Sequence, residues 1–317
     1  KLIARSAPDG DEQVELTKSG DLQHVRIFWS PDSHKFVLLD TQPGQDHTVH
    51  MVESSPRDQV QPRLKSHQYL KPGDKIAVTK PRLFDMQKRR ELPLDDALFR
   101  NPWSIEQLRW AADSSRMTFI YNQRGHQVLR LVAIDAKTGS ARTLIEETPA
   151  TFVDYSNKQF AYYVENGGDI LWMSERDGLN HLYRFDASGS LKNQITSGEW
   201  VVRAVDRIDE DHQQIWFRAM GMNPSEDPYH IHYCRVNFDG SGLVRLTAGD
   251  GTHEIRYSPD RSVFIDRFSR VDLPPVHELR RSDDGALICQ LEQADIGRLD
   301  EMPGWRMPER FVAKGRD

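Results

Sequence analysis

The sequence has little cysteine, no long apolar run and no extended stretch of helical periodicity. Its two cysteines, Cys234 and Cys289, are too few for a disulfide scaffold or a four-cysteine zinc site. They could form one disulfide, but each lies inside a strand-like run, which favours two buried free thiols. No apolar run approaches the roughly 18 residues that cross a membrane as a helix, so no membrane span is expected.

Charge of one sign is not in large excess either. The chain carries 42 basic and 48 acidic residues, a net charge of −6. The basic run Lys88-Arg89-Arg90 is isolated, which is typical of a solvated loop and predicts no nucleic-acid partner. A content of 28% charged and 38% hydrophobic residues in a chain of 317 is typical of a globular protein with a large core.

Three short strands are predicted to follow one another between Ile170 and Thr196. They comprise residues 170–174, 181–185 and 191–196, and the turns between them contain Gly178 and Gly189. Aromatic and β-branched residues favour the pleated surface, while Asp and Gly supply the turn geometry. This stretch therefore predicts an antiparallel meander.

The last hairpin of the meander recurs along the chain. The turn glycines of the matching hairpins are Gly139, Gly189, Gly240 and Gly285, separated by 50, 51 and 45 residues. A period of about 40–50 residues is typical of propeller blades.

A second repeating element precedes this hairpin, at residues 27–39, 108–120 and 255–265. In each copy an aromatic residue ends one strand, and a short polar turn leads into the next. Two hairpins per repeat predict four antiparallel strands. The expected fold class is therefore all-β, a partial β-propeller with four-stranded antiparallel blades.

The predicted domain organisation is one incomplete propeller over residues 1–317. An N-terminal half blade is expected at residues 3–17, and a proline-rich insertion at residues 53–105. The chain starts and stops abruptly, which favours a piece of a longer protein. Five fuller blades are expected near residues 25–65, 105–147, 152–197, 200–247 and 253–293.

Two histidines, His230 and His232, lie two residues apart on one face of a predicted strand. Glu226 or Asp227 could join them in a metal site. Zinc takes three or four protein ligands, however, and no further His or Cys stands at ligand spacing. The sequence therefore predicts no metal site and no cofactor.

Large aromatic and charged residues suggest packing roles more than binding roles. Trp29, Trp110, Trp172 and Trp216 lie in or at the end of inner strands, which favours a core between blades. The turn Glu175-Arg176-Asp177 is interpreted either as an internal salt-bridge turn or as part of a surface facing another domain.

Several motifs together resemble the propeller of the prolyl oligopeptidase / dipeptidyl peptidase IV family of serine peptidases. The most specific is WMSERDGLNHLY at residues 172–183, which resembles the W-S-E-R-D-G-x-N-H-L-Y of bacterial members. Single S-P-D turns are common in other propellers and carry less weight. Further motifs match in the family's order: WSPD at 29–32, YLKPGD at 69–74, GEWVV at 198–202 and FSRVDLPP at 268–275.

The resemblance implies an eight-bladed propeller over an α/β-hydrolase domain, with the catalytic Ser, Asp and His following the propeller in sequence. This sequence contains no G-x-S-x-G elbow, and Gly240-Ser241-Gly242 lacks its spacing. We therefore predict no catalytic residue in this chain, leave its substrate-binding residues unknown, and expect the hydrolase domain in a missing part of the parent. The parent is expected to be periplasmic or secreted and to cleave peptides after proline or a small residue near the N-terminus.

Family dipeptidyl peptidases hold the free amine of the substrate with paired glutamates just before the W-S-P-D blade, and a carboxylate pair suits an ammonium group. Residues 18–25 read KSGDLQHV and lack such a pair. Glu146-Glu147 is the alternative, with a solvated strand end as the ordinary interpretation. The expected partners are the hydrolase domain and a peptide substrate, and homodimerisation is left open. The alternative function is a stand-alone propeller that acts as a protein-interaction module.

Overall fold

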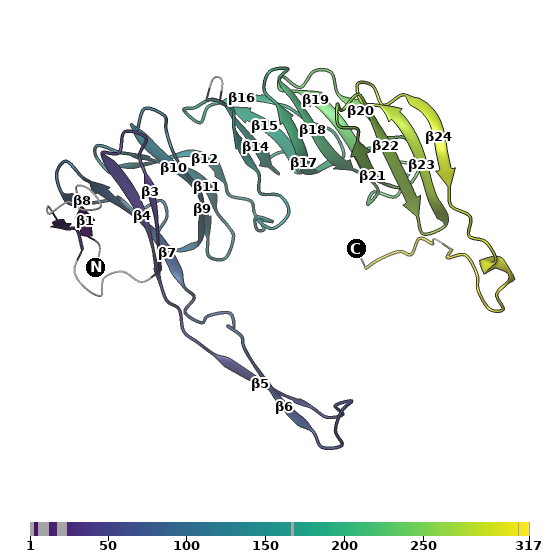
Figure 1. Ribbon diagram of the computed structural model, residues 1–317, viewed down its shortest axis with the longest axis horizontal. Helices are drawn as coiled ribbons and strands as arrows, with labels where there is room; N and C mark the ends of the chain where they lie inside the picture. Colours follow the sequence, from purple (N-terminus) through teal and green to yellow (C-terminus); the bar gives the residue numbers. More distant parts are fainter. Residues whose placement is uncertain (1–2, 6–12, 18–23, 166–167, 310, 317) are drawn as a thin grey trace. The chain divides into compact units, whose positions relative to one another are not determined.

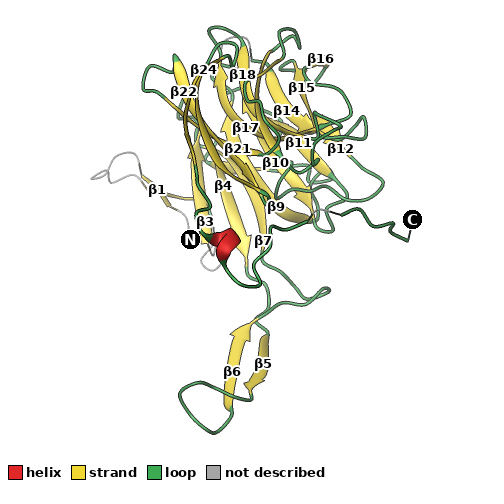
Figure 2. Ribbon diagram, turned by 90° about the vertical axis from the view of Figure 1, so that its right-hand side faces the viewer, coloured by secondary structure: helices red, strands yellow, loops and turns green. Residues whose placement is uncertain are grey.

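The structure is a computed structural model, and nearly all of its regular structure is β-strand. The single helical element in the described part of the chain is a short 3-10 turn, η1 (Leu299–Glu301) (Figure 2). No helix there is long and apolar enough to cross a membrane. The strands fall into two compact units, residues 1–153 and 154–317, and the all-β prediction is confirmed. The described residues are 3–5, 13–17, 24–165, 168–309 and 311–316.

Unit 1 contains two four-stranded antiparallel sheets and two separate hairpins (Figure 1). The sheet orders are β3-β4-β7-β8 and β12-β11-β10-β9. The hairpin β1–β2 pairs as the repeat at residues 3–17 predicts, and its turn lies outside the described residues. The strands are β1 (Ile3–Arg5), β2 (Gln13–Glu15), β3 (His24–Trp29), β4 (Lys35–Gln42), β5 (Thr48–Glu53), β6 (Arg63–Gln68), β7 (Val78–Asp85), β8 (Arg90–Leu92), β9 (Pro102–Trp110), β10 (Arg116–Gln123), β11 (Leu129–Asp135) and β12 (Ala141–Glu147).

Unit 2 contains three four-stranded antiparallel sheets in which the strands follow one another in sequence. This is the meander order predicted for propeller blades. The first sheet comprises β13 (Ala161–Tyr163), β14 (Ile170–Ser174), β15 (His181–Phe185) and β16 (Leu191–Gln194). The second comprises β17 (Val201–Asp209), β18 (Gln214–Met220), β19 (Ile231–Asn237) and β20 (Val244–Arg245), and the third β21 (Thr252–Tyr257), β22 (Val263–Arg270), β23 (Leu273–Arg281) and β24 (Leu287–Gln293).

The proline-rich segment differs from its prediction as an insertion over residues 53–105. Only the hairpin β5–β6 leaves the first sheet, as Figure 1 shows, whereas β7 and β8 return to it. Pro81 is compatible with β7 because β8 pairs only with its end, at Leu83–Asp85. The prediction of an insertion is wrong for β7 and β8. A proline is tolerated in a strand at a position where a second strand does not pair with it.

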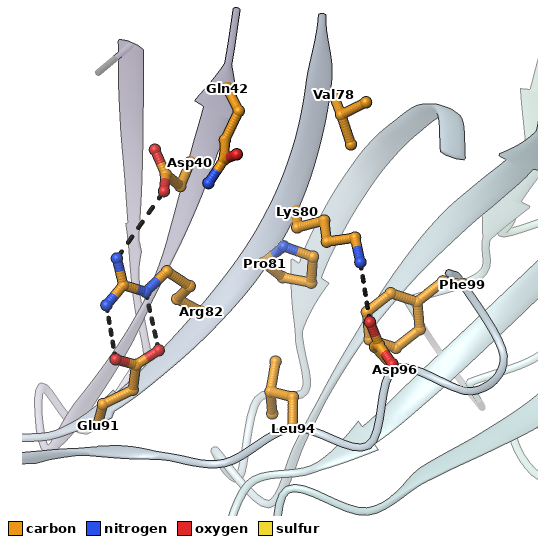
Figure 3. Close-up of a pocket in the computed structure, with 10 residues that line it drawn as sticks. All are labelled: Asp40, Gln42, Val78, Lys80, Pro81, Arg82, Glu91, Leu94, Asp96 and Phe99. Atoms are coloured by element: carbon orange, nitrogen blue, oxygen red, sulfur yellow. Dashed lines mark hydrogen bonds and ion pairs between the residues drawn. The ribbon is translucent and has the colours of Figure 1, made fainter. Parts of the chain in front are cut away.

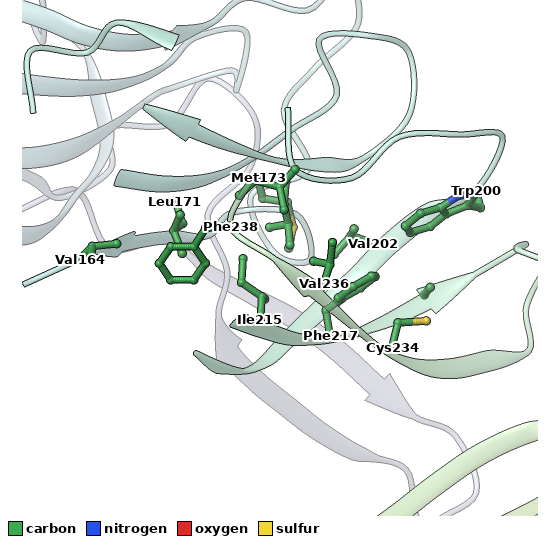
Figure 4. Packing of buried hydrophobic residues seen from close by; sticks show 13 residues of the cluster. Val164, Leu171, Met173, Trp200, Val202, Ile215, Phe217, Cys234, Val236 and Phe238 are labelled. Atoms are coloured by element: carbon green, nitrogen blue, oxygen red, sulfur yellow. The ribbon is translucent and has the colours of Figure 1, made fainter. Parts of the chain in front are cut away.

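Each unit has a core between consecutive sheets. In unit 2, Leu171 and Met173 of β14 belong to the same buried cluster as Val202, Phe217 and Val236 of the next sheet (Figure 4). Alternate residues of β18 and β19 are buried, as period-two patterning requires. A comparable cluster in unit 1 joins β4 and β7 of one sheet to β9, β10 and β11 of the other.

The S-P-D turns between the first two strands of a sheet share one hydrogen-bonded geometry. Ser30 Oγ donates to Asp32 Oδ1 at 2.6 Å, and Ser258 Oγ donates to Asp260 Oδ1 at 2.6 Å. Hydrogen bonds from these serines hold the pKa of both aspartates below the usual value. The next residue in each turn, Ser33 or Arg261, has a φ near +60°. The serine and aspartate therefore stabilise a backbone conformation that non-glycine residues rarely adopt.

The repeated turn glycines have a second role beyond positive φ. A Cβ atom on Gly139 would lie 2.1 Å from the carbonyl oxygen of Pro93, and one on Gly285 would lie 2.4 Å from that of Leu246. In both cases the contacted backbone follows the last strand of the preceding sheet. Absence of a side chain thus lets one sheet's outer turn approach the neighbouring sheet.

Two packing predictions are corrected by the fold. Trp172 is fully buried, but Trp29 is 53% exposed because it ends β3, the edge strand of its sheet. Cys234 is buried in β19, whereas Cys289 is exposed on the outermost strand β24, where every residue is exposed. Both cysteines are free thiols, so the prediction of two buried thiols is wrong for Cys289.

The two thiols are expected to differ in reactivity. Burial raises the pKa of Cys234 to about 12, so its reactive thiolate is scarce at neutral pH. A chromogenic disulfide reagent should therefore modify one thiol in the native chain and two after denaturation. In Cys289→Ser the native reaction should disappear, and rapid modification of Cys234 in that variant would contradict this assignment.

Candidate functional site

The candidate serine of the G-S-G segment sits in a tight turn between β19 and β20. Ser241 Oγ donates to Asp239 Oδ1 at 2.7 Å, which stabilises the turn. A Ser–His pair does occur on the β5–β6 hairpin, where His50 Nδ1 and Ser66 Oγ lie 2.8 Å apart. Both residues are exposed, and no hydrogen bond joins His50 to a carboxylate in the described part of the chain. A nucleophile needs an oriented base and an oxyanion site, so neither serine forms a catalytic site.

The most specific sequence motif, at residues 172–183, joins two consecutive sheets. The side chain of Asn180 donates to the carbonyl of Val202 at 2.7 Å, and Val202 N–H donates to the carbonyl of Asn180 at 2.8 Å. His181 is buried, with Nε2 donating to the carbonyl of Gly198 at 3.0 Å and Nδ1 3.1 Å from Thr196 Oγ1. The Asn-His pair of the motif therefore has a structural role between β15 and β17.

The next sheet repeats this histidine–threonine contact. Thr247 Oγ1 lies 3.3 Å from Nδ1 of His232 and accepts from the N–H of Tyr233 at 3.1 Å. In the preceding copy, Thr196 Oγ1 accepts from Leu182 N–H at 2.9 Å. Each histidine stands 15 residues before its threonine. This histidine–threonine contact can be recognised in the sequence of each sheet from a His at the start of the third strand and a Thr shortly after the fourth.

The charged turn at residues 175–177 contacts neighbouring segments of the chain. Glu175 pairs with Lys158 at 2.5 Å, and Asp177 accepts from Gln194 at 2.5 Å. The guanidinium of Arg176 lies 4.9 Å from the ring centre of Tyr183, a cation–π distance. Glu175 and Asp177 thus each have a partner outside the turn, and an internal salt-bridge turn and a surface facing another domain both stay predictions.

Glu146 and Glu147 end β12 on opposite faces of the strand. Glu146 forms an ion pair with Arg130 of the neighbouring strand. A substrate amine would have to compete with this guanidinium. The geometry favours the ordinary interpretation of a strand end over an amine clamp.

A pocket of about 690 Å³ lies against β4, β7 and the segment after β8 in unit 1 (Figure 3). Arg82 donates to both carboxylate oxygens of Glu91, at 2.8 and 2.6 Å. Lys80 donates to Asp96 at 2.8 Å on the other side of the pocket. Both cations are thus held by carboxylates within the pocket.

Asp40 is a buried residue of the pocket with unused hydrogen-bonding capacity. Its carboxylate is buried, its Oδ2 lies 3.8 Å from Arg82, and its Oδ1 has no hydrogen-bond partner. A ligand with a donor group could satisfy that oxygen. The pocket therefore offers a buried acceptor, while Lys80 and Arg82 are already paired with carboxylates.

The four residues that the sequence suggested for a metal site do not share one site in the structure. His232 donates through Nε2 to Glu226 Oε2 at 2.7 Å, so both of its ring nitrogens have protein partners. Nδ1 of His230 instead lies 3.1 Å from Oδ1 of Asp250, a residue that the sequence pattern did not suggest as a metal ligand. Asp227 holds the loop, since its Oδ1 accepts from the N–H of Tyr229 at 2.9 Å.

The protonation of this region follows from burial and hydrogen bonding. Burial acts to raise the pKa of Glu226, but hydrogen bonds from His232 and Asn223 outweigh it and leave the pKa below its usual value. Burial lowers the pKa of His232, and its hydrogen bond to Glu226 offsets only part of the effect. The arrangement is a carboxylate accepting from a neutral imidazole.

Comparison with known proteins identifies one family. The family model described as "Dipeptidyl peptidase IV (DPP IV) N-terminal region" matches residues 23–275. Among solved structures, dipeptidyl peptidase 4 of Porphyromonas gingivalis is 18% identical, with a TM-score of 0.63 over 92% of this chain and 42% of that chain. At this identity the likeness shows the fold alone.

Two curated proteins are also similar in sequence. Inactive dipeptidyl peptidase 10 of Rattus norvegicus is 20% identical over 63% of this chain and 26% of its own length. A Schizosaccharomyces pombe protein provisionally named as a dipeptidyl aminopeptidase is 23% identical over 84% of this chain and 35% of its own length. This chain thus spans less than half the length of each protein that it matches here.

Proposed function

The chain belongs to the family of dipeptidyl peptidase IV N-terminal regions, and on that premise we propose that it is the substrate-gating part of a dipeptidyl peptidase IV-like serine peptidase. In this proposal the parent carries the Ser, Asp and His of catalysis in an α/β-hydrolase domain outside these residues. The propeller limits access to that domain and helps to position a peptide, and the parent acts in the periplasm or outside the cell.

The observation that carries the proposal is the family match over residues 23–275, combined with a sequence that has no nucleophile elbow. Ser241 of the G-S-G segment lies in a tight turn, and Ser66, which lies beside His50, is on an exposed hairpin. Binding and gating are what such a chain can contribute, because acyl transfer needs a nucleophile, a base and an oxyanion site together.

One observation favours a second candidate, a propeller that acts only through protein interactions. One of the similar proteins is named as an inactive dipeptidyl peptidase. Membership of the family therefore does not require catalysis by the parent, and a propeller fold serves many functions.

The purified chain is expected to release no product from proline-containing dipeptide amides. The parent protein, purified in the same way, should cleave them and lose this activity when its nucleophile is replaced by alanine. Turnover by the chain alone would refute the assignment of catalysis to another domain. A parent without any turnover would support the interaction module instead.

Gating can be tested separately on the active parent. A peptide substrate and the same sequence embedded in a folded protein should be cleaved at very different rates. Tethering the propeller with engineered disulfides between its sheets should slow peptide cleavage but not the reaction of a small active-site-directed phosphonate. Equal effects on both reagents would contradict a gating role.

A further inference from the structure

Three potential metal ligands meet in unit 2 where two consecutive sheets approach each other. Glu226, His230 and Asp250 each present one ligand atom, and these atoms lie within 4.8 Å of one another. Glu226 and His230 belong to the loop between β18 and β19, at residues 221–230. Asp250 belongs to the connection between β20 and β21, so the cluster spans two sheets.

Two atoms of the cluster are buried and lack hydrogen-bond partners. These are Nδ1 of His230 and Oδ1 of Asp250. They lie 3.1 Å apart, yet their geometry is not that of a hydrogen bond. The His230 side chain is only 10% exposed. Buried polar atoms without partners are costly, and a cation placed between a ring nitrogen and a carboxylate oxygen would satisfy both.

The ligating carboxylates have outer partners of the kind that metal sites use. Glu226 accepts from Nε2 of His232 at 2.7 Å and from Nδ2 of Asn223 at 2.5 Å. Asp250 pairs through Oδ2 with Arg270, which leaves Oδ1 available. Arg270 is also held by Asp272 at 2.6 Å. Such partners orient the ligands, so the donor set is positioned in advance.

The loops that carry the ligands are fixed by the backbone. Gly249 and Gly251 flank Asp250, and a Cβ atom on either would lie 2.8 Å from Phe268 or from the carbonyl oxygen of Ser269. The connection is therefore packed directly against β22. On the other loop, Glu226 N–H donates to the carbonyl of Asn223 and His230 N–H to that of Asp227. These turns place both side chains on the side facing Asp250.

We propose that Glu226, His230 and Asp250 bind a divalent transition-metal ion of the zinc type, which links the two sheets. One imidazole nitrogen and two carboxylate oxygens match the donor atoms of zinc sites with three protein ligands, with water completing the coordination. Calcium and magnesium prefer sites made of oxygen alone and suit this set less well. The ion would balance the two carboxylates and couple binding to the stability of unit 2.

The proposed zinc site can be tested on the tag-free full chain after a chelator has removed all bound metal. Calorimetric titration with zinc chloride should show one equivalent bound, and the thermal midpoint should rise with zinc and fall again with chelator. His230→Gln and Asp250→Asn should each weaken zinc binding by at least about 10-fold. His212→Gln, an exposed histidine outside the cluster, is the matched control and should bind zinc like the unaltered chain.

Cobalt substitution gives a readout that does not depend on the variants. Co²⁺ added to the metal-free chain should produce visible absorption bands of a four- or five-coordinate site, and zinc should abolish them. Calcium at the same concentration should not. Absence of these bands, calcium binding in preference to zinc, or equal zinc affinity in His230→Gln and His212→Gln would overturn the proposal.

Discussion

Replacing Asp266 with alanine is expected to lower the free energy of unfolding of unit 2 by about 3–5 kcal/mol, the range for removing one partner of a buried ion pair. Asp266 lies in β22 with a fully buried carboxylate. His253 Nδ1 lies 2.9 Å from Oδ1, and Arg280 Nε lies 3.5 Å from Oδ2. Nε2 of His253 donates to the carbonyl of Gly249 at 3.1 Å. Both ring nitrogens thus face acceptors, and alanine would leave a buried donor unpaired.

Local unfolding free energies from hydrogen exchange of β21, β22 and β23 measure this effect without assuming that both units unfold together. Asp283→Ala is the control in the same sheet, because its side chain is 74% exposed and its ion pair is screened. Asp266→Asn should give an intermediate loss, since the amide oxygen can still accept. A loss below about 1 kcal/mol in Asp266→Ala would show that the carboxylate is not needed.

Truncation of Phe217 to alanine is expected to destabilise unit 2 by about 3–5 kcal/mol. Phe217 is fully buried in β18, in the cluster between the first two sheets of the unit (Figure 4). Its ring stacks on Trp200 with centroids 5.9 Å apart. Alanine would remove that contact and leave a cavity that sheets held by backbone hydrogen bonds cannot close.

Chemical denaturation followed by tryptophan fluorescence suits this variant, because Trp200 lies beside the altered position. Phe311→Ala makes the same chemical change at a site that is 84% exposed and should cost less than about 0.5 kcal/mol. A similar loss of unfolding free energy in Phe217→Ala and Phe311→Ala would mean that the buried cluster around Phe217 does not hold the two sheets together.

The repeat could be predicted from the sequence because it is encoded locally. Turn glycines such as Gly189 and S-P-D turns such as residues 30–32 act within a few residues, through positive φ and short hydrogen bonds. The approach of Gly285 to Leu246 could not be predicted, because it depends on the distance between two sheets. The same applies to Trp29, whose exposure follows from the edge position of β3.

The candidate metal site shows the limit of spacing arguments. The spacing of His230 and His232 favours a shared site, but His230 lies in the loop before β19 and pairs with Asp250, whereas His232 lies in the strand and bonds to Glu226. His232 supports Glu226 from outside the cluster, while Asp250 lies 20 residues after His230 in the sequence. A glycine on each side of Asp250 was the available signal, and it became meaningful only once both glycines were seen against β22.

The sequence by itself determined the class of fold, the order of strands within a blade and the family. These depend on period-two patterning and on turn chemistry, which are properties of adjacent residues. The tertiary structure alone decided which polar groups share a buried space, including His253 with Asp266 and His230 with Asp250. Such pairs form between strands and loops distant in sequence, where packing of one sheet on the next sets the distance.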